Sequence, residues 1–190
     1  DDFLTSDSIK KKVEFLENNL EYGLVRSKAN VFKEKDLAVH IFEIKPSNEE
    51  ERIFEELILE KTYVTCGCYM VRKTVLDETI EDREIYVSNG GQNWQILLPM
   101  TYKHKCGYID EPLYSYIIRE NSHSHSVKKK NDLLNRTYEH EDILKNTIIR
   151  IDGIDGNYYN DLIDIKYWRK RLEIAGRYGD KNLALENFEK

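Results

Sequence analysis

Cysteine is scarce in this sequence, and so are long apolar runs. The three cysteines are an odd number and too few for a disulfide framework, so their usage fits a reducing compartment and we expect a cytoplasmic protein. No apolar run is long enough to span a bilayer and no signal-peptide pattern is present, which leaves peripheral membrane contact open. No internal repeat or low-complexity tract occurs.

Positive charge is in deficit as well. The net charge is −6, and because a nonspecific nucleic-acid binder needs a basic surface, we exclude that class. With 190 residues, 40% of them hydrophobic and 34% charged, the chain can bury the core of one domain or slightly more. It begins with Asp1-Asp2 and not Met, which predicts a processed chain or a piece of a longer one.

Hydrophobic periodicity predicts helices alternating with strands in residues 1–126. Ile9, Val13 and Leu16 recur at helical spacing and predict an amphipathic helix with these residues on its apolar side. Ser47 and Glu50 have capping-box spacing, so we expect a second helix to open there. Strands are predicted at residues 22–27, 31–32 and 37–44, and a buried one at 62–71, with Gly67 at a point of close approach.

The stretch from 88 to 126 attracts most attention. Gly90 and Gly91 precede a helix that opens with Gln92, Asn93 and Trp94, and polar groups at a helix entrance can face a ligand. Trp94 offers a face for a sugar ring or base, although a core tryptophan is the plainer interpretation. After the helix, residues 106–109 and 113–118 predict a pair of strands joined by a turn.

Residues 127–190 have a different character. Apolar residues recur at helical spacing on both sides of a Gly153/Gly156 loop, and Gly179-Asp180 precedes a last short helix. We expect a C-terminal helical hairpin that packs on itself or on the core, and we find no obvious chemistry in it. The predicted organisation is therefore a domain at 1–126 and a helical extension at 127–190.

Three groups of side chains could bind a metal. Asp1 and Asp2 are suited to a hard cation such as Mg²⁺ or Mn²⁺, with a solvated chain end as the plainer interpretation. His123 and His125 can point the same way from an extended loop and share a metal or phosphate, or can belong to an ordinary surface loop. The thiolates of Cys66, Cys68 and Cys106 could coordinate Zn²⁺, but a fourth ligand is not evident, and the interpretation of these residues as buried free thiols is favoured.

Taken in order, several segments resemble a family 2 glycosyltransferase with a GT-A fold. Asp1-Asp2-Phe3-Leu4 resembles the segment that closes the family's DxD metal motif, with Asp1 as the closing aspartate. Residues 65–72 (TCGCYMVR) resemble the glycine-containing strand before the acceptor site, and residues 91–98 resemble the Gly-Glu-Asp-Trp/Phe stretch and its helix. Residues 108–116 and 119–126 resemble the ending of the domain.

The resemblance implies an α/β fold, a partial GT-A-like mixed sheet flanked by helices. It implies transfer of a sugar from a nucleoside-diphosphate donor to a hydroxyl of a carbohydrate or lipid-linked acceptor, in cell-surface polysaccharide or glycolipid synthesis. Asp1 and Asp2, with His123 or His125, would hold Mg²⁺ or Mn²⁺, and Gln92, Asn93 and Trp94 would line the acceptor side.

Two departures from the family pattern matter. The family's N-terminal βαβ nucleotide-binding unit does not precede Asp1, so we expect residues 1–190 alone to show no transfer. The family's glutamate–aspartate pair is Gln92-Asn93, and an amide at the position of the usual base cannot take the acceptor proton. The base then lies elsewhere, with Glu84, Asp110 and Glu111 nearby in sequence, or the role has changed.

Two other classes of function stay open. The loss of both acidic residues at Gln92-Asn93 favours a noncatalytic sugar- or partner-binding module. A metal-dependent hydrolase built on His123 and His125 is the third, and it would require a bound transition metal.

Overall fold

A mixed sheet forms the centre of the molecule. The computed structural model describes residues 2–80, 84–88, 90–119 and 129–188. In these residues the sheet contains β1 (Phe3–Leu4), β2 (Tyr22–Lys33), β3 (Phe42–Ile44), β4 (Tyr69–Val71) and β5 (Lys105–Ile118). The strand order is β1-β5-β2-β3, and β4 also pairs with β2. The prediction of an α/β fold with a mixed, helix-flanked sheet is confirmed at this level.

The long strands β2 and β5 run parallel along the middle of the sheet. The predicted strand pair at 106–109 and 113–118 is wrong, because both segments belong to the single strand β5. Ser27 lies opposite Ile109 and Lys28 lies opposite Pro112, so Asp110 and Glu111 bulge out of the ladder. The residues that suggested a turn therefore form an irregularity within one strand.

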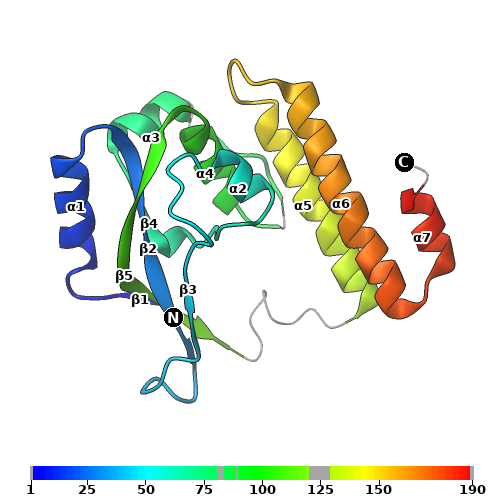
Figure 1. The fold of residues 1–190 in the computed structure, drawn as a ribbon, viewed down its shortest axis with the longest axis horizontal. Coiled ribbons are helices and arrows are strands. Elements are labelled where there is room, and N and C mark those ends of the chain that lie inside the picture. Colours follow the sequence, from blue (N-terminus) through cyan, green and yellow to red (C-terminus); the bar gives the residue numbers. More distant parts are fainter. Residues whose placement is uncertain (1, 81–83, 89, 120–128, 189–190) are drawn as a thin grey trace.

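Helices cover both faces of the sheet. Figure 1 shows α1 (Ser8–Asn18) on one side and α2 (Phe54–Ile58) with α4 (Asn93–Lys103) on the other. The predicted α1 exists, but its buried residues are Ser8, Lys12 and Leu16, whereas Ile9 and Val13 are exposed. The expectation that Ile9 and Val13 face the core is wrong, because Lys12 turns inward to donate to the carbonyl of Gly67, 3.2 Å away.

Residues 46–72 depart most from the sequence prediction. No capping box forms at Ser47, whose hydroxyl donates to the Lys61 carbonyl, and α2 begins only at Phe54. The strand predicted at 62–71 is confined to β4, preceded by a 3-10 turn at Cys66–Cys68. Thr62 lies outside β4, and its hydroxyl accepts a hydrogen bond from the buried Arg26 guanidinium at 2.6 Å. After β4, α3 (Lys73–Thr79) leads toward α4.

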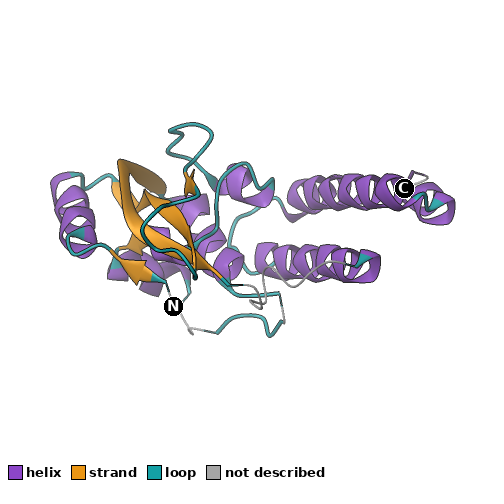
Figure 2. Cartoon of the chain, turned by 90° about the horizontal axis from the view of Figure 1, so that it is seen from below, coloured by secondary structure: helices purple, strands orange, loops and turns teal. Residues whose placement is uncertain are grey.

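The C-terminal helices pack on the core, as one of the two predicted alternatives. α5 (Lys130–Ile148) and α6 (Gly156–Tyr178) form a hairpin, followed by α7 (Lys181–Phe188). Figure 2 shows the hairpin extending away from the sheet. Ile143, Ile148 and Ile163 nevertheless belong to the same buried cluster as Leu24 of β2. One hydrophobic core therefore spans both predicted domains, whose boundary at 126/127 lies outside the described residues.

Candidate functional site

The first turn of α4 carries the residues singled out for acceptor binding. Gln92 precedes the helix and is exposed, with no side-chain capping bond, and Asn93 is half-buried. Trp94 is only 6% exposed, and its indole N–H donates to the Leu57 carbonyl at 3.0 Å. The three neighbours therefore do not form one open polar surface.

The ring of Trp94 is a core residue, as the plainer interpretation expected. His140 of α5 packs edge-on against it, with ring centroids 4.8 Å apart, and the ammonium of Lys166 lies 5.3 Å from its centroid. A freely exposed face for a sugar ring is therefore not present at Trp94. Its edge reaches a cleft on the side of α5 and α6.

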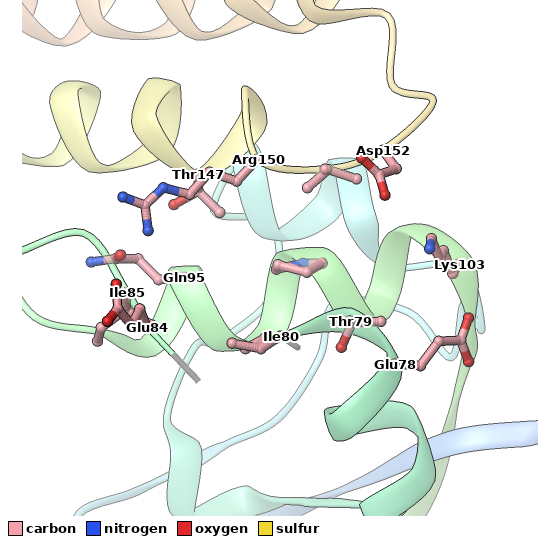
Figure 3. A pocket seen from close by; sticks show the side chains of 12 residues that line it. Glu78, Thr79, Ile80, Glu84, Ile85, Gln95, Lys103, Thr147, Arg150 and Asp152 are labelled. Carbon is pink, nitrogen blue, oxygen red and sulfur yellow. The ribbon is translucent and has the colours of Figure 1, made fainter. Parts of the chain in front are cut away.

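A cavity of about 370 Å³, which we call the α4 cavity, lies on the side of α4 opposite that cleft. The end of α3, the outer face of α4 and the end of α5 form its walls. In Figure 3, Arg150 lies beside Gln95 at one end, while Lys103, Glu78 and Asp152 lie toward the other. Ile80, Ile85, Pro99 and Ile151 add apolar surface between them. Mixed hydrogen-bonding and apolar walls of this size suit a small polar molecule.

Gln95 fixes one wall of this cavity. Its amide accepts from the Tyr86 backbone N–H at 2.6 Å and donates to the Tyr86 carbonyl at 2.9 Å. This paired contact holds residues 84–86 against α4 and places Glu84 in the cavity wall. Arg150 and Asp152 were not predicted from the sequence, because nothing in the helical pattern of α5 shows that its end meets α4.

No protein-family model and no curated protein matches this chain. The site is therefore interpreted from its own geometry. In the described part of the chain, none of the helices is both long and apolar enough to cross a membrane.

A separate cluster joins three segments on the α1 side of the sheet. The hydroxyl of Tyr114 in β5 donates to one carboxylate oxygen of Asp2 at 2.6 Å, and the Ile117 N–H donates to the other at 2.8 Å. The Tyr114 ring also lies against Gly67, where an added Cβ would overlap it, so the predicted close approach at Gly67 is confirmed. Burial, followed by the Asp2 contact, raises the pKa of Tyr114 above its usual value.

The possible metal ligands are only partly described. Asp1, His123 and His125 lie outside the described residues, so their assignment stays a prediction. Both carboxylate oxygens of Asp2 are already hydrogen-bonded to β5, which suits a positioning role. Across the described ranges no group of three or more His, Cys, Asp or Glu could hold a metal, and all three cysteines are free. The described residues alone therefore do not fit a Mg²⁺, Mn²⁺ or Zn²⁺ site.

The three carboxylates considered as a replacement base differ in their surroundings. Asp110 accepts from Tyr108 at 2.8 Å and pairs with Lys28, whose hydrogen bond lowers the pKa of Asp110. Glu111 pairs with Lys11 on α1. Of the three, Glu84 is the one that lines a cavity together with the first turns of α4.

Proposed function

We propose that this chain is the acceptor-side portion of a GT-A-like family 2 glycosyltransferase. The parent enzyme transfers a sugar from a nucleoside-diphosphate donor to a hydroxyl group of a carbohydrate or lipid-linked acceptor. The mixed sheet is the coarse architecture that such a fold requires. The transferase assignment itself rests on the ordered resemblance of the sequence segments.

The observation that carries the proposal is the convergence at Tyr114. Three segments that resemble family motifs contribute Asp2, Gly67 and Tyr114, and Tyr114 contacts both of the others although the three are far apart in sequence. Lys12 adds a hydrogen bond to the Gly67 carbonyl. Matched segments of one domain should meet in space, and these three do, whereas the matched segment at residues 91–98 contributes Gln95 to the cavity in Figure 3.

The cavity in Figure 3 is the proposed acceptor site. Its carboxylates, amide and basic groups can hydrogen-bond sugar hydroxyls, and its isoleucines and proline can contact the apolar side of a ring. Within the proposal Glu84 takes the acceptor proton, since Asn93 cannot act as a base. Mg²⁺ or Mn²⁺ stays an expectation of the resemblance, and no step is assigned to it.

The proposal is tested by hydrolysis and transfer assays with UDP- and GDP-sugars on the protein in its natural length. We expect turnover that is lost in Asp1→Ala and reduced at least about a hundredfold in Glu84→Gln, a typical effect of removing a general base. Glu111→Gln is the matched control, because Glu111 pairs with Lys11 away from the cavity. Equal loss in both glutamate variants would contradict the role of Glu84.

The alternative is a noncatalytic sugar-binding module, and the amide at Asn93 favours it. A protein that binds sugars in the α4 cavity without consuming any donor would support this alternative. Arg150→Gln should then weaken binding, because Arg150 lies at the end of the cavity beside Gln95.

A further inference from the structure

The cleft that the edge of Trp94 reaches has a volume of about 520 Å³ and lies between the helical hairpin and residues 60–64. It is lined entirely by described residues and is separate from the cavity in Figure 3. Val64, Leu133 and Ile174 form an apolar wall, and the edges of Trp94 and Tyr167 contribute to it. Arg136, Lys170 and Arg177 project from α5 and α6 around the same space.

Cations outnumber carboxylates at this cleft, although the whole chain is acidic. The acids that line it are Glu60 and Glu173, against Arg136, Lys170 and Arg177, with Lys166 buried beneath. The pKa of His140 reflects the same surroundings: burial, followed by Arg136, Lys170 and Lys166, lowers it to about 4 against an opposing effect of Glu60. The cleft is therefore a positively charged recess in a chain of net charge −6.

The wall beneath the cleft is held in a fixed conformation. Glu60 adopts a left-handed backbone conformation with φ 55°, which is uncommon for a residue other than glycine. Its carboxylate pairs with Lys166 at 2.9 Å and with Lys170. Lys166 also donates to the Ile58 carbonyl at 2.6 Å, so α6 is tied to the turn after α2 at several points. The recess is thus formed before any ligand arrives.

From the apolar wall and the cationic rim we propose that this cleft binds a phosphate ester with an apolar body. The phosphate lies between Arg136 and Arg177, whose planar guanidinium groups match its oxygens, and the ammonium of Lys170 adds a third positive charge. The apolar part lies against Val64, Leu133 and Ile174. This binding site does not depend on the proposed transfer reaction, and it is distinct from the proposed acceptor cavity.

The test uses octyl phosphate as the probe and Trp94 as the reporter. Trp94 and Trp168 are the two tryptophans of the chain, so Trp168→Phe leaves Trp94 as the single tryptophan, which is excited selectively at the cleft. We expect saturable binding with a Kd of about 1 mM or tighter, the range for a ligand of this size. Octanol and inorganic phosphate, each of which lacks one half of the probe, should bind at least about tenfold more weakly.

Charge variants separate this site from nonspecific attraction. Arg177→Gln should weaken octyl phosphate binding about tenfold or more, and Glu173→Gln should tighten it, because both side chains are exposed at the rim. Arg150→Gln is the matched control at the other cavity and should leave binding unchanged. A folding defect cannot mimic the tightening expected for Glu173→Gln.

Vesicle-binding measurements distinguish a lipid headgroup from a free phosphate ester as the ligand. Vesicles of phosphatidylcholine with phosphatidylglycerol that bind the protein in an Arg177-dependent manner would assign the site to lipid headgroups. Binding of octyl phosphate without vesicle binding would assign it to a free phosphate ester. Octanol binding as tightly as octyl phosphate, or equal weakening by Arg150→Gln and Arg177→Gln, would overturn the proposal.

Discussion

Replacing Gly67 by alanine should destabilise the protein through one identifiable collision. A Cβ at Gly67 would lie 2.7 Å from Cδ2 of Tyr114 and closer still to Cε2 and Cζ. A shift of the ring would disturb the hydrogen bond that its hydroxyl donates to Asp2 at 2.6 Å. Lys12, which binds the Gly67 carbonyl, limits how far the backbone can shift instead.

The expected magnitude follows from these two effects. Overpacking by one methyl group typically costs about 1–3 kcal/mol. Displacing the Tyr114 hydroxyl from the Asp2 carboxylate also breaks a charge-assisted hydrogen bond, whose loss costs about 1–2 kcal/mol. This cost is at the low end because Asp2 is exposed to solvent. We therefore expect Gly67→Ala to lower the free energy of unfolding by about 2–4 kcal/mol.

A double-mutant cycle measures whether Tyr114 is the cause. In a Tyr114→Ala background the ring atoms that would clash with the new Cβ are absent, so adding Gly67→Ala should lower the free energy of unfolding by less than about 1 kcal/mol. Gly176→Ala is the control, because its added Cβ meets nothing within 4 Å and should stabilise α6 by about 0.5–1 kcal/mol. Urea denaturation followed by circular dichroism gives all four values. The same cost for Gly67→Ala in both backgrounds would refute the reasoning.

Three further predictions concern buried polar groups. Arg26→Ala should lower the free energy of unfolding by about 3–5 kcal/mol, because the Thr62 hydroxyl and the Glu50 carbonyl lose their hydrogen-bond donor and a cavity is left. Arg26→Met should lower it by less, because methionine keeps most of the side-chain volume. Urea denaturation measures both values. Trp94→Phe should cost about 1–3 kcal/mol in the same assay, since the Leu57 carbonyl loses its indole donor. The pKa of His140 is lowered to about 4, so the unfolded chain binds a proton at this residue before the folded chain does as the pH falls from 6.5. The free energy of unfolding should therefore drop by about 2 kcal/mol by pH 4.5, and His140→Gln should remove this contribution to the pH dependence. An NMR titration of His140 with a midpoint near 6.5 would contradict this prediction.

The fold class and the existence of most helices could be predicted from the sequence, because apolar periodicity indicates where helices form, although in α1 it assigned Ile9 and Val13 wrongly to the core. The pairing of β5 with β2 could not, since the partner of a parallel strand lies far away in sequence. The Asp110-Glu111-Pro112 segment therefore gave the signal of a turn, although it forms a bulge. Local pattern distinguishes these two outcomes poorly.

Buried polar residues explain most of the other differences. Lys12 faces inward because the Gly67 carbonyl accepts a hydrogen bond from its ammonium, and Arg26 is fully buried because Thr62 and nearby carbonyls surround it. Residue type alone places both at the surface, since lysine and arginine are usually exposed. At the candidate site, the sequence located α4 and its first turn, but Arg150 and Asp152 reach the cavity only through packing of α5 on α4.

The central claim is that the parent enzyme transfers sugar from a nucleoside-diphosphate donor, and the family 2 pattern that the sequence resembles is of the inverting type, which implies a single displacement that inverts the anomeric centre. The most direct measurement is proton NMR of the sugar first released from an α-linked UDP- or GDP-sugar by the protein in its natural length. The account predicts that the β-anomer appears first and that Glu84→Gln slows its release. First release of the α-anomer, or no consumption of any donor, would contradict it.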